Sequence, residues 1–225
     1  MAKHNNYFLH YSSRNSSIEL LRVVFMMLIM LIHAYGHGSG LDYDWIYSLG
    51  ADSATAYHLG LFSIGKVGVT GFMFISGYYG IKFHGGKLWN MLSMLLFYLL
   101  IVEIVAGVNV FAIFQSLLHP WDQWWFVSCY LLVFILSPII NTGIEKLTEK
   151  QFRFIVLGML LYTYVGHFIM RTNSQDLELL LTIFLAARYV RLYGRAVWQK
   201  YSGVCALVLA GVLFFSPILL SQVGG

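Results

Sequence analysis

Long uninterrupted apolar runs dominate the pattern of this chain. Polar residues gather in short stretches between the runs and do not alternate with apolar ones, as they would in the strands of a membrane β-barrel. A membrane-spanning helix needs about 20 mostly apolar residues. Segments of that kind lie at 18–36, 62–81, 88–106, 124–142, 153–170, 177–194 and 202–221. The pattern therefore predicts an all-α, polytopic transmembrane helix bundle of about seven spans.

The composition favours a lipid bilayer as the surroundings of the protein. Hydrophobic residues make up 59% of the chain and charged residues 11%, and the mean hydropathy is +0.71. Soluble globular domains are far more polar than this. The net charge is +4, but the basic residues are dispersed between apolar runs, which argues against a nucleic-acid partner. No histidine and cysteine cluster has the spacing of a metal site, so we expect no metal.

The basic residues also predict how the chain is oriented in the membrane. All but Lys66 and Arg171 fall on one side if the N-terminus is cytoplasmic. They are Lys3, Arg14, Arg22, Lys82, Lys87, Lys146, Lys150, Arg153, Arg188, Arg191, Arg195 and Lys200. The positive-inside rule then makes residues 1–17 a cytoplasmic tail and 18–225 the membrane domain. With no cleavage pattern after the first apolar run, we expect an uncleaved anchor and a multi-pass protein of the inner membrane.

Ionisable side chains inside spans are costly, so they point to function, and Arg22 and His33 are the most informative pair. Eleven residues make about three helical turns, which brings both side chains to nearly the same face, about 16 Å apart. Such a helix suits a donor with an anionic head and a long thin arm. Arg22 would hold phosphate and His33 would act as general base. The alternative is that Arg22 is a membrane-surface anchor and His33 bonds to a neighbouring helix.

Four segments of the chain resemble acyltransferase family 3, the membrane O-acyltransferases that modify surface polysaccharides. These segments are Ser17-Ile18-Glu19-Leu20-Leu21-Arg22 with His33, Gly71-Phe72-Met73-Phe74-Ile75-Ser76-Gly77-Tyr78, Trp124-Trp125-Phe126 through Leu136-Ser137-Pro138, and more weakly Ala186-Ala187-Arg188-Tyr189-Val190-Arg191. The resemblance runs across nearly the whole chain.

The resemblance implies transfer of an acyl group, usually acetyl, to a hydroxyl of an extracytoplasmic or lipid-linked sugar. Acetyl-CoA would be the co-substrate, no cofactor would be bound, and Arg22 and His33 would be the functional pair. Many members carry arginines just after the Ser-Gly-Tyr element, where this chain has Lys82 and Lys87. Lysine binds phosphate as a point charge without the bidentate fork of arginine. Family members also have more helices, so the chain is expected to lack the C-terminal ones.

Three further residues are candidates for substrate binding. Glu103 would orient His33 or a substrate hydroxyl, Lys66 would neutralise an anionic group near the outer face, and His37 lies one turn beyond His33 as a second base. For Glu103 and Lys66 an interhelical polar pair is the alternative, and for His37 a solvated loop position. Two other function classes stay open, namely a glycan or lipid transporter and a non-catalytic truncated homologue.

Overall fold

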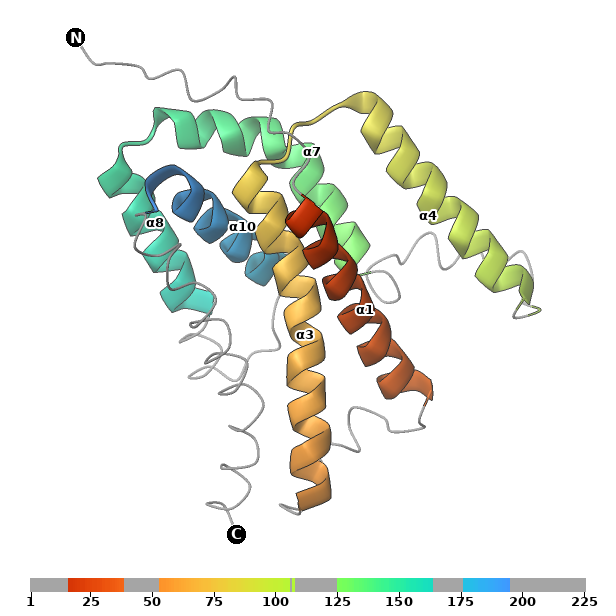
Figure 1. Ribbon diagram of the computed structural model, residues 1–225. Coiled ribbons are helices and arrows are strands. Elements are labelled where there is room, and N and C mark those ends of the chain that lie inside the picture. The colour runs from red at the N-terminus through yellow and green to blue at the C-terminus, as the bar shows by residue number, and fades with distance from the viewer. Residues whose placement is uncertain (1–15, 39–52, 106, 108–124, 164–175, 195–225) are drawn as a thin grey trace. The chain divides into compact units, whose positions relative to one another are not determined.

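The computed structural model describes residues 16–38, 53–105, 107, 125–163 and 176–194 (Figure 1). Its helices are α1 (Ser16–Gly38), α3 (Ser53–Tyr79), α4 (Gly85–Val105), α7 (Trp125–Lys146), α8 (Glu149–Leu161) and α10 (Asp176–Tyr193). Within these ranges there is no strand, which confirms the expected all-α class.

Among the described residues, two helices are long and apolar enough to cross a membrane by length and composition. They are Ser16–Ala34 within α1 and Trp125–Lys146, which is α7. Both helices are consistent with a helical membrane protein. The predicted fifth span ran over 153–170, of which 164–170 lie outside the described residues, as does the whole predicted span at 202–221. The count of about seven spans and the orientation therefore stay predictions.

The boundaries of α3 differ from the predicted 62–81. The helix begins at Ser53, because its first turns are polar enough to escape a search for apolar runs and yet hold no residue that breaks a helix. It ends at Tyr79, because Gly80 adopts a φ of +77° and donates its N–H to the Gly77 carbonyl at 3.2 Å. Glycine is favoured just past a helix end for this left-handed conformation.

The start of α8 is fixed by a capping box that precedes the predicted start at Arg153. The Thr148 Oγ1 accepts the Gln151 N–H at 3.4 Å, and the Gln151 Oε1 accepts the Thr148 N–H at 3.0 Å. Each side chain thus satisfies a backbone donor that the first helical turn leaves unpaired.

We expect Thr148→Ala to lower the free energy of unfolding by about 1 kcal/mol, because the cap loses its acceptor. The measurement is thermal unfolding of the detergent-solubilised protein. The control is Lys150→Ala, which changes an exposed side chain in the same turn. Equal unfolding temperatures for the two variants would contradict the role of the cap.

The chain divides into two compact units, residues 1–68 with 212–225 and residues 69–211, and the division falls within α3. In the first unit, two glycines let α3 approach α1 closely. A Cβ at Gly65 would lie 2.9 Å from the Ile32 Cβ, and one at Gly68 would lie 2.7 Å from the Phe25 carbonyl oxygen. Because the later glycine meets the earlier residue, the two helices run antiparallel.

In the second unit, α10 packs on α7 and α8 and also receives the end of α3. A Cβ at Gly77 would lie 2.5 Å from the carbonyl oxygen of Phe184, a fully buried residue of α10. On α7, the rings of Phe126 and Tyr130 lie 6.1 and 6.3 Å from that of Phe72. Phe72 and Gly77, both in the segment 71–78, therefore serve helix packing.

Pro138 lies inside α7 without ending the helix. A proline has no N–H, so the carbonyl four residues earlier, that of Phe134, loses its usual helical donor. The buried Ser137 hydroxyl donates to this carbonyl at 2.7 Å instead. Ser137 thus supplies, within the helix, the hydrogen bond that the Phe134 carbonyl needs and that lipid could not supply.

Candidate active site

Arg22 and His33 both lie on α1, which is helical without a break between them. The face of α1 that meets α3 includes Phe25, Ile29 and Ile32. At about 100° per residue, Arg22 and His33 lie beside that face on the same side of the helix. Arg22 is half-buried and His33 is exposed within its unit.

Arg22 is paired with a carboxylate of its own helix. Its Nη1 lies 3.1 Å from the Glu19 Oε1, and the two side chains are 39% and 44% exposed. A pair this exposed contributes little to stability, about 0–1 kcal/mol. Glu19 therefore holds the Arg22 guanidinium only weakly.

The contact of His33 with the backbone selects one tautomer of its neutral ring. Its Nδ1 lies 2.8 Å from the Ile29 carbonyl oxygen. A carbonyl only accepts hydrogen bonds, so Nδ1 must carry the proton and donate it. In the neutral ring Nε2 is then the basic nitrogen, which is the form that a general base needs.

The structure describes the side chain of one of the three predicted substrate-binding residues, Lys66. Lys66 is exposed on α3, one residue after Gly65, which contacts Ile32, so it lies near the level of His33. His37 belongs to α1 and Glu103 to α4, but the side chains of both lie outside the described residues. The structure thus places Lys66 and His33 on two neighbouring helices, and the roles of Lys66, His37 and Glu103 all stay predictions.

Lys82 and Lys87, the predicted phosphate ligands, are exposed residues of the unit 69–211. Lys82 follows the end of α3, and Lys87 lies in the first turn of α4. Arg22 belongs to the other unit. The roles of all three residues as phosphate ligands stay predictions.

Two arginines of α10 meet the end of α3. The Arg188 guanidinium lies against Gly80, where an added Cβ would be 2.9 Å from Nη1. The Arg191 Nη1 donates to the Tyr78 hydroxyl at 3.4 Å, and its guanidinium carbon lies 5.1 Å from the centre of the Tyr78 ring. These contacts were not predicted, because both arginines were interpreted only as basic residues of the cytoplasmic side, although Arg188-Tyr189-Val190-Arg191 lies in a segment that resembles the family.

Asn141 of α7 belongs to the same cluster. Its Nδ2 donates to the Ile81 carbonyl at 2.8 Å, just beyond the end of α3. Its Oδ1 and the Nε of Arg188 are both buried without a hydrogen-bond partner among the described residues. The pattern of apolar residues does not single out Asn141, because this residue lies at the polar end of the predicted span 124–142.

A second cluster of polar side chains, which was not predicted from the sequence, joins α10 to the end of α8. The Thr163 hydroxyl lies 3.2 Å from the Glu178 Oε1 and 3.0 Å from the Thr182 hydroxyl. Both threonines are buried. Because these groups satisfy one another, the cluster is best explained as an interhelical polar contact.

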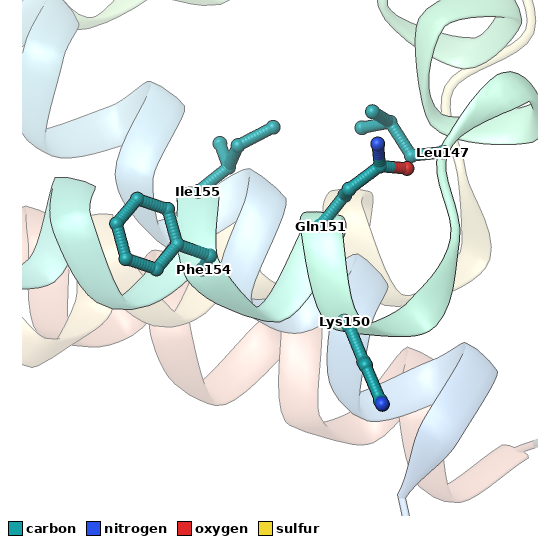
Figure 2. A pocket seen from close by; sticks show the side chains of 5 residues that line it. All are labelled: Leu147, Lys150, Gln151, Phe154 and Ile155. Atoms are coloured by element: carbon teal, nitrogen blue, oxygen red, sulfur yellow. The ribbon is translucent and has the colours of Figure 1, made fainter.

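A shallow depression of about 450 Å³ is lined by Leu147, Lys150, Gln151, Phe154 and Ile155 (Figure 2). These residues come from the α7–α8 turn and the start of α8, and Figure 2 shows Lys150 pointing away from Ile155. Lysine is the only charged member of this set, and no general base accompanies it. The depression therefore lacks the chemistry of an acyl-transfer site.

Comparison with known proteins assigns the chain to a family. The family model for acyltransferase family 3, described as an acyltransferase domain, matches residues 15–223. No curated protein and no solved structure matches the chain. The matched region contains all the described helices, including the residues of α1 and α10 discussed above. The chain therefore belongs to acyltransferase family 3.

Proposed function

We propose that this protein is a membrane O-acyltransferase that moves an acyl group, acetyl in the first instance, from acyl-CoA to a hydroxyl of an extracytoplasmic or lipid-linked sugar. Family membership supports acyltransferase activity in a membrane. The observation that carries the finer assignment is the placement of a weakly paired guanidinium and an imidazole bonded through Nδ1 to a backbone carbonyl on one side of α1.

In this proposal Arg22 binds a phosphate of the donor. The guanidinium offers a planar fork to phosphate oxygens, and its bond to the exposed Glu19 is easily replaced. From Arg22 to His33 the helix rises about 16 Å, so a pantetheine arm laid along α1 would carry its thioester toward the imidazole. Lys82 and Lys87 are proposed as further phosphate ligands on the cytoplasmic side.

His33 is proposed as the general base. Its Nε2 takes the proton of the sugar hydroxyl while the hydroxyl oxygen attacks the thioester carbonyl. The carbon–sulfur bond then breaks, the imidazolium returns the proton to the leaving thiolate, and an ester and free CoA result. Glu103 is proposed to orient His33 or the acceptor, Lys66 to neutralise an anionic group of the acceptor, and His37 to stand in as a second base.

The proposed topology has about seven spans, with the N-terminus on the cytoplasmic side of the inner membrane. Contacts within the unit 69–211 support it. Gly80 after α3, Asn141 near the end of α7, and Arg188 near the end of α10 lie together, and the sequence assigned all three helix ends to the cytoplasmic side.

We expect Arg22→Gln to raise the KM for acetyl-CoA by about 10- to 100-fold, because a charge-assisted hydrogen bond to phosphate is lost. The thermal unfolding temperature should change little, since the ion pair with Glu19 is exposed. The control is Glu19→Gln, which removes the same ion pair without removing the guanidinium. An equal rise in KM for both variants would mean that the ion pair, and not phosphate binding, is what matters.

The function is tested by mass analysis of the surface polysaccharide from cells with and without this protein. We expect acyl substituents, acetyl first, to be lost from the polysaccharide when the protein is absent and to return when it is supplied again. An unchanged pattern of substitution would reject the acyltransferase assignment for glycan. Loss of the whole polysaccharide from the surface would favour a transporter instead.

A further inference from the structure

Near the end of α3 lies a cluster of polar side chains, and two of its buried atoms lack a hydrogen-bond partner among the described residues. Arg188 of α10 and Asn141 of α7 reach it from two different helices. The Arg188 Nε is a buried donor and the Asn141 Oδ1 a buried acceptor, and neither has a hydrogen-bond partner in the described part of the chain. Buried polar groups are nearly always paired, so an unpaired donor and an unpaired acceptor on side chains that reach the adjacent residues Gly80 and Ile81 indicate a ligand that supplies both.

The charge of the cluster indicates that this ligand is an anion. Arg191 and Glu145 are the charged residues that act on Arg188 electrostatically. Arg191 repels it, and among the described residues no carboxylate forms an ion pair with it. Two guanidinium groups against one carboxylate leave the cluster positive. A water molecule would satisfy the hydrogen bonds but would not neutralise a half-buried positive charge.

The Arg188 guanidinium lies against the backbone at Gly80. The φ of +77° favours glycine at position 80, and a Cβ added there would lie 2.9 Å from the Arg188 Nη1. With Nη1 against Gly80, the Nε edge of the guanidinium is the side that can meet two oxygens of one phosphate. The Nε atom is covered in this structure, so binding of a phosphate to that edge requires the Arg188 side chain to turn outward.

We propose that Arg188, Arg191 and Asn141 bind a phosphate ester that also carries a hydroxyl or amino donor. The arginines bind the phosphate oxygens, and the Asn141 Oδ1 accepts a hydrogen bond from the donor group. Resting on the proposed function, the ester is that of acyl-CoA, whose nucleotide carries phosphates, hydroxyls and an amino group. A phospholipid headgroup with free hydroxyls has the same chemistry and is the other source.

The test measures binding of acetyl-CoA to the full-length protein in nanodiscs of neutral lipid. Arg188→Gln is expected to weaken binding by about 10- to 100-fold, because a charge-assisted bond to phosphate is lost. Arg153→Gln is the matched control, since it removes an exposed arginine of α8, and should leave binding unchanged. Asn141→Asp adds a negative charge at the end of α3 that repels a phosphate, and should also weaken binding at least tenfold.

A second arm separates the two sources of phosphate. Phosphatidylglycerol or phosphatidylcholine is added to the detergent-solubilised protein, and the rise in unfolding temperature is compared between the wild type and Arg188→Gln. A rise that depends on Arg188 with phosphatidylglycerol alone supports the phosphate-ester site and assigns it to lipid. If Arg188 and Asn141 affect neither arm, the site is refuted. If the wild type binds acetyl-CoA in that case, the proposed function survives; if it binds none, the proposed function fails separately.

Discussion

Replacing His33 by asparagine is expected to lower the rate of acyl transfer by about 10²- to 10⁴-fold, the usual contribution of a general base. Asparagine is chosen because its amide nitrogen can take the place of Nδ1 and keep the bond to the Ile29 carbonyl, which is 2.8 Å long in the wild type. Only the basic Nε2 is then lost. The measurement is acyl transfer by membranes that contain equal amounts of each protein.

Two controls make the His33 result specific. Met30→Ala changes an exposed side chain of the same helix, 67% exposed, and should leave the rate unchanged. The affinity of His33→Asn for acetyl-CoA should equal that of the wild type, because the imidazole acts on the acceptor proton. Transfer at the wild-type rate by His33→Asn would remove His33 from the mechanism.

Replacing Gly77 by alanine is expected to lower the free energy of unfolding by about 1–3 kcal/mol, and leucine should cost more. The added Cβ would lie 2.5 Å from the Phe184 carbonyl oxygen and 2.9 Å from the Phe184 Cα. Both are backbone atoms, so α3 and α10 must move apart. The better helix propensity of alanine, about 1 kcal/mol, offsets only part of this strain. Thermal unfolding in detergent measures the change.

Gly143→Ala in α7 and Gly158→Ala in α8 are matched controls, because an added Cβ at either position meets nothing within 4 Å. These variants should unfold at the same or a slightly higher temperature, since alanine favours a helix. If Gly77→Ala were as stable as these two variants, the close packing of α3 on α10 would be wrong.

The helical class was predictable because, in lipid, backbone N–H and C=O groups must be hydrogen-bonded within the protein, and continuous apolar runs achieve this as helices. Apolar runs of spanning length located α1, α4 and α7 to within a few residues. The same criterion missed the first turns of α3, since it detects burial in lipid and not helix formation. The capping box at Thr148 was readable as Thr-x-x-Gln, and it explains why α8 begins before the predicted start.

The site was predictable only in part. Helical spacing alone places Arg22 and His33 on one side of α1, but the Glu19 pair and the tautomer of His33 depend on side-chain geometry. The cluster at Arg188 depends on the left-handed Gly80 and on contacts between helices far apart in sequence. Such contacts leave no periodic signal, so Arg188 could be read only as a surface cation.

The most direct test of the account is equilibrium binding of acetyl-CoA to the purified full-length protein. The account predicts saturable binding that free CoA displaces, that Arg22→Gln weakens and that Met30→Ala leaves unchanged. A protein that is folded, as judged by its thermal unfolding, and yet shows no saturable binding of acetyl-CoA would contradict it.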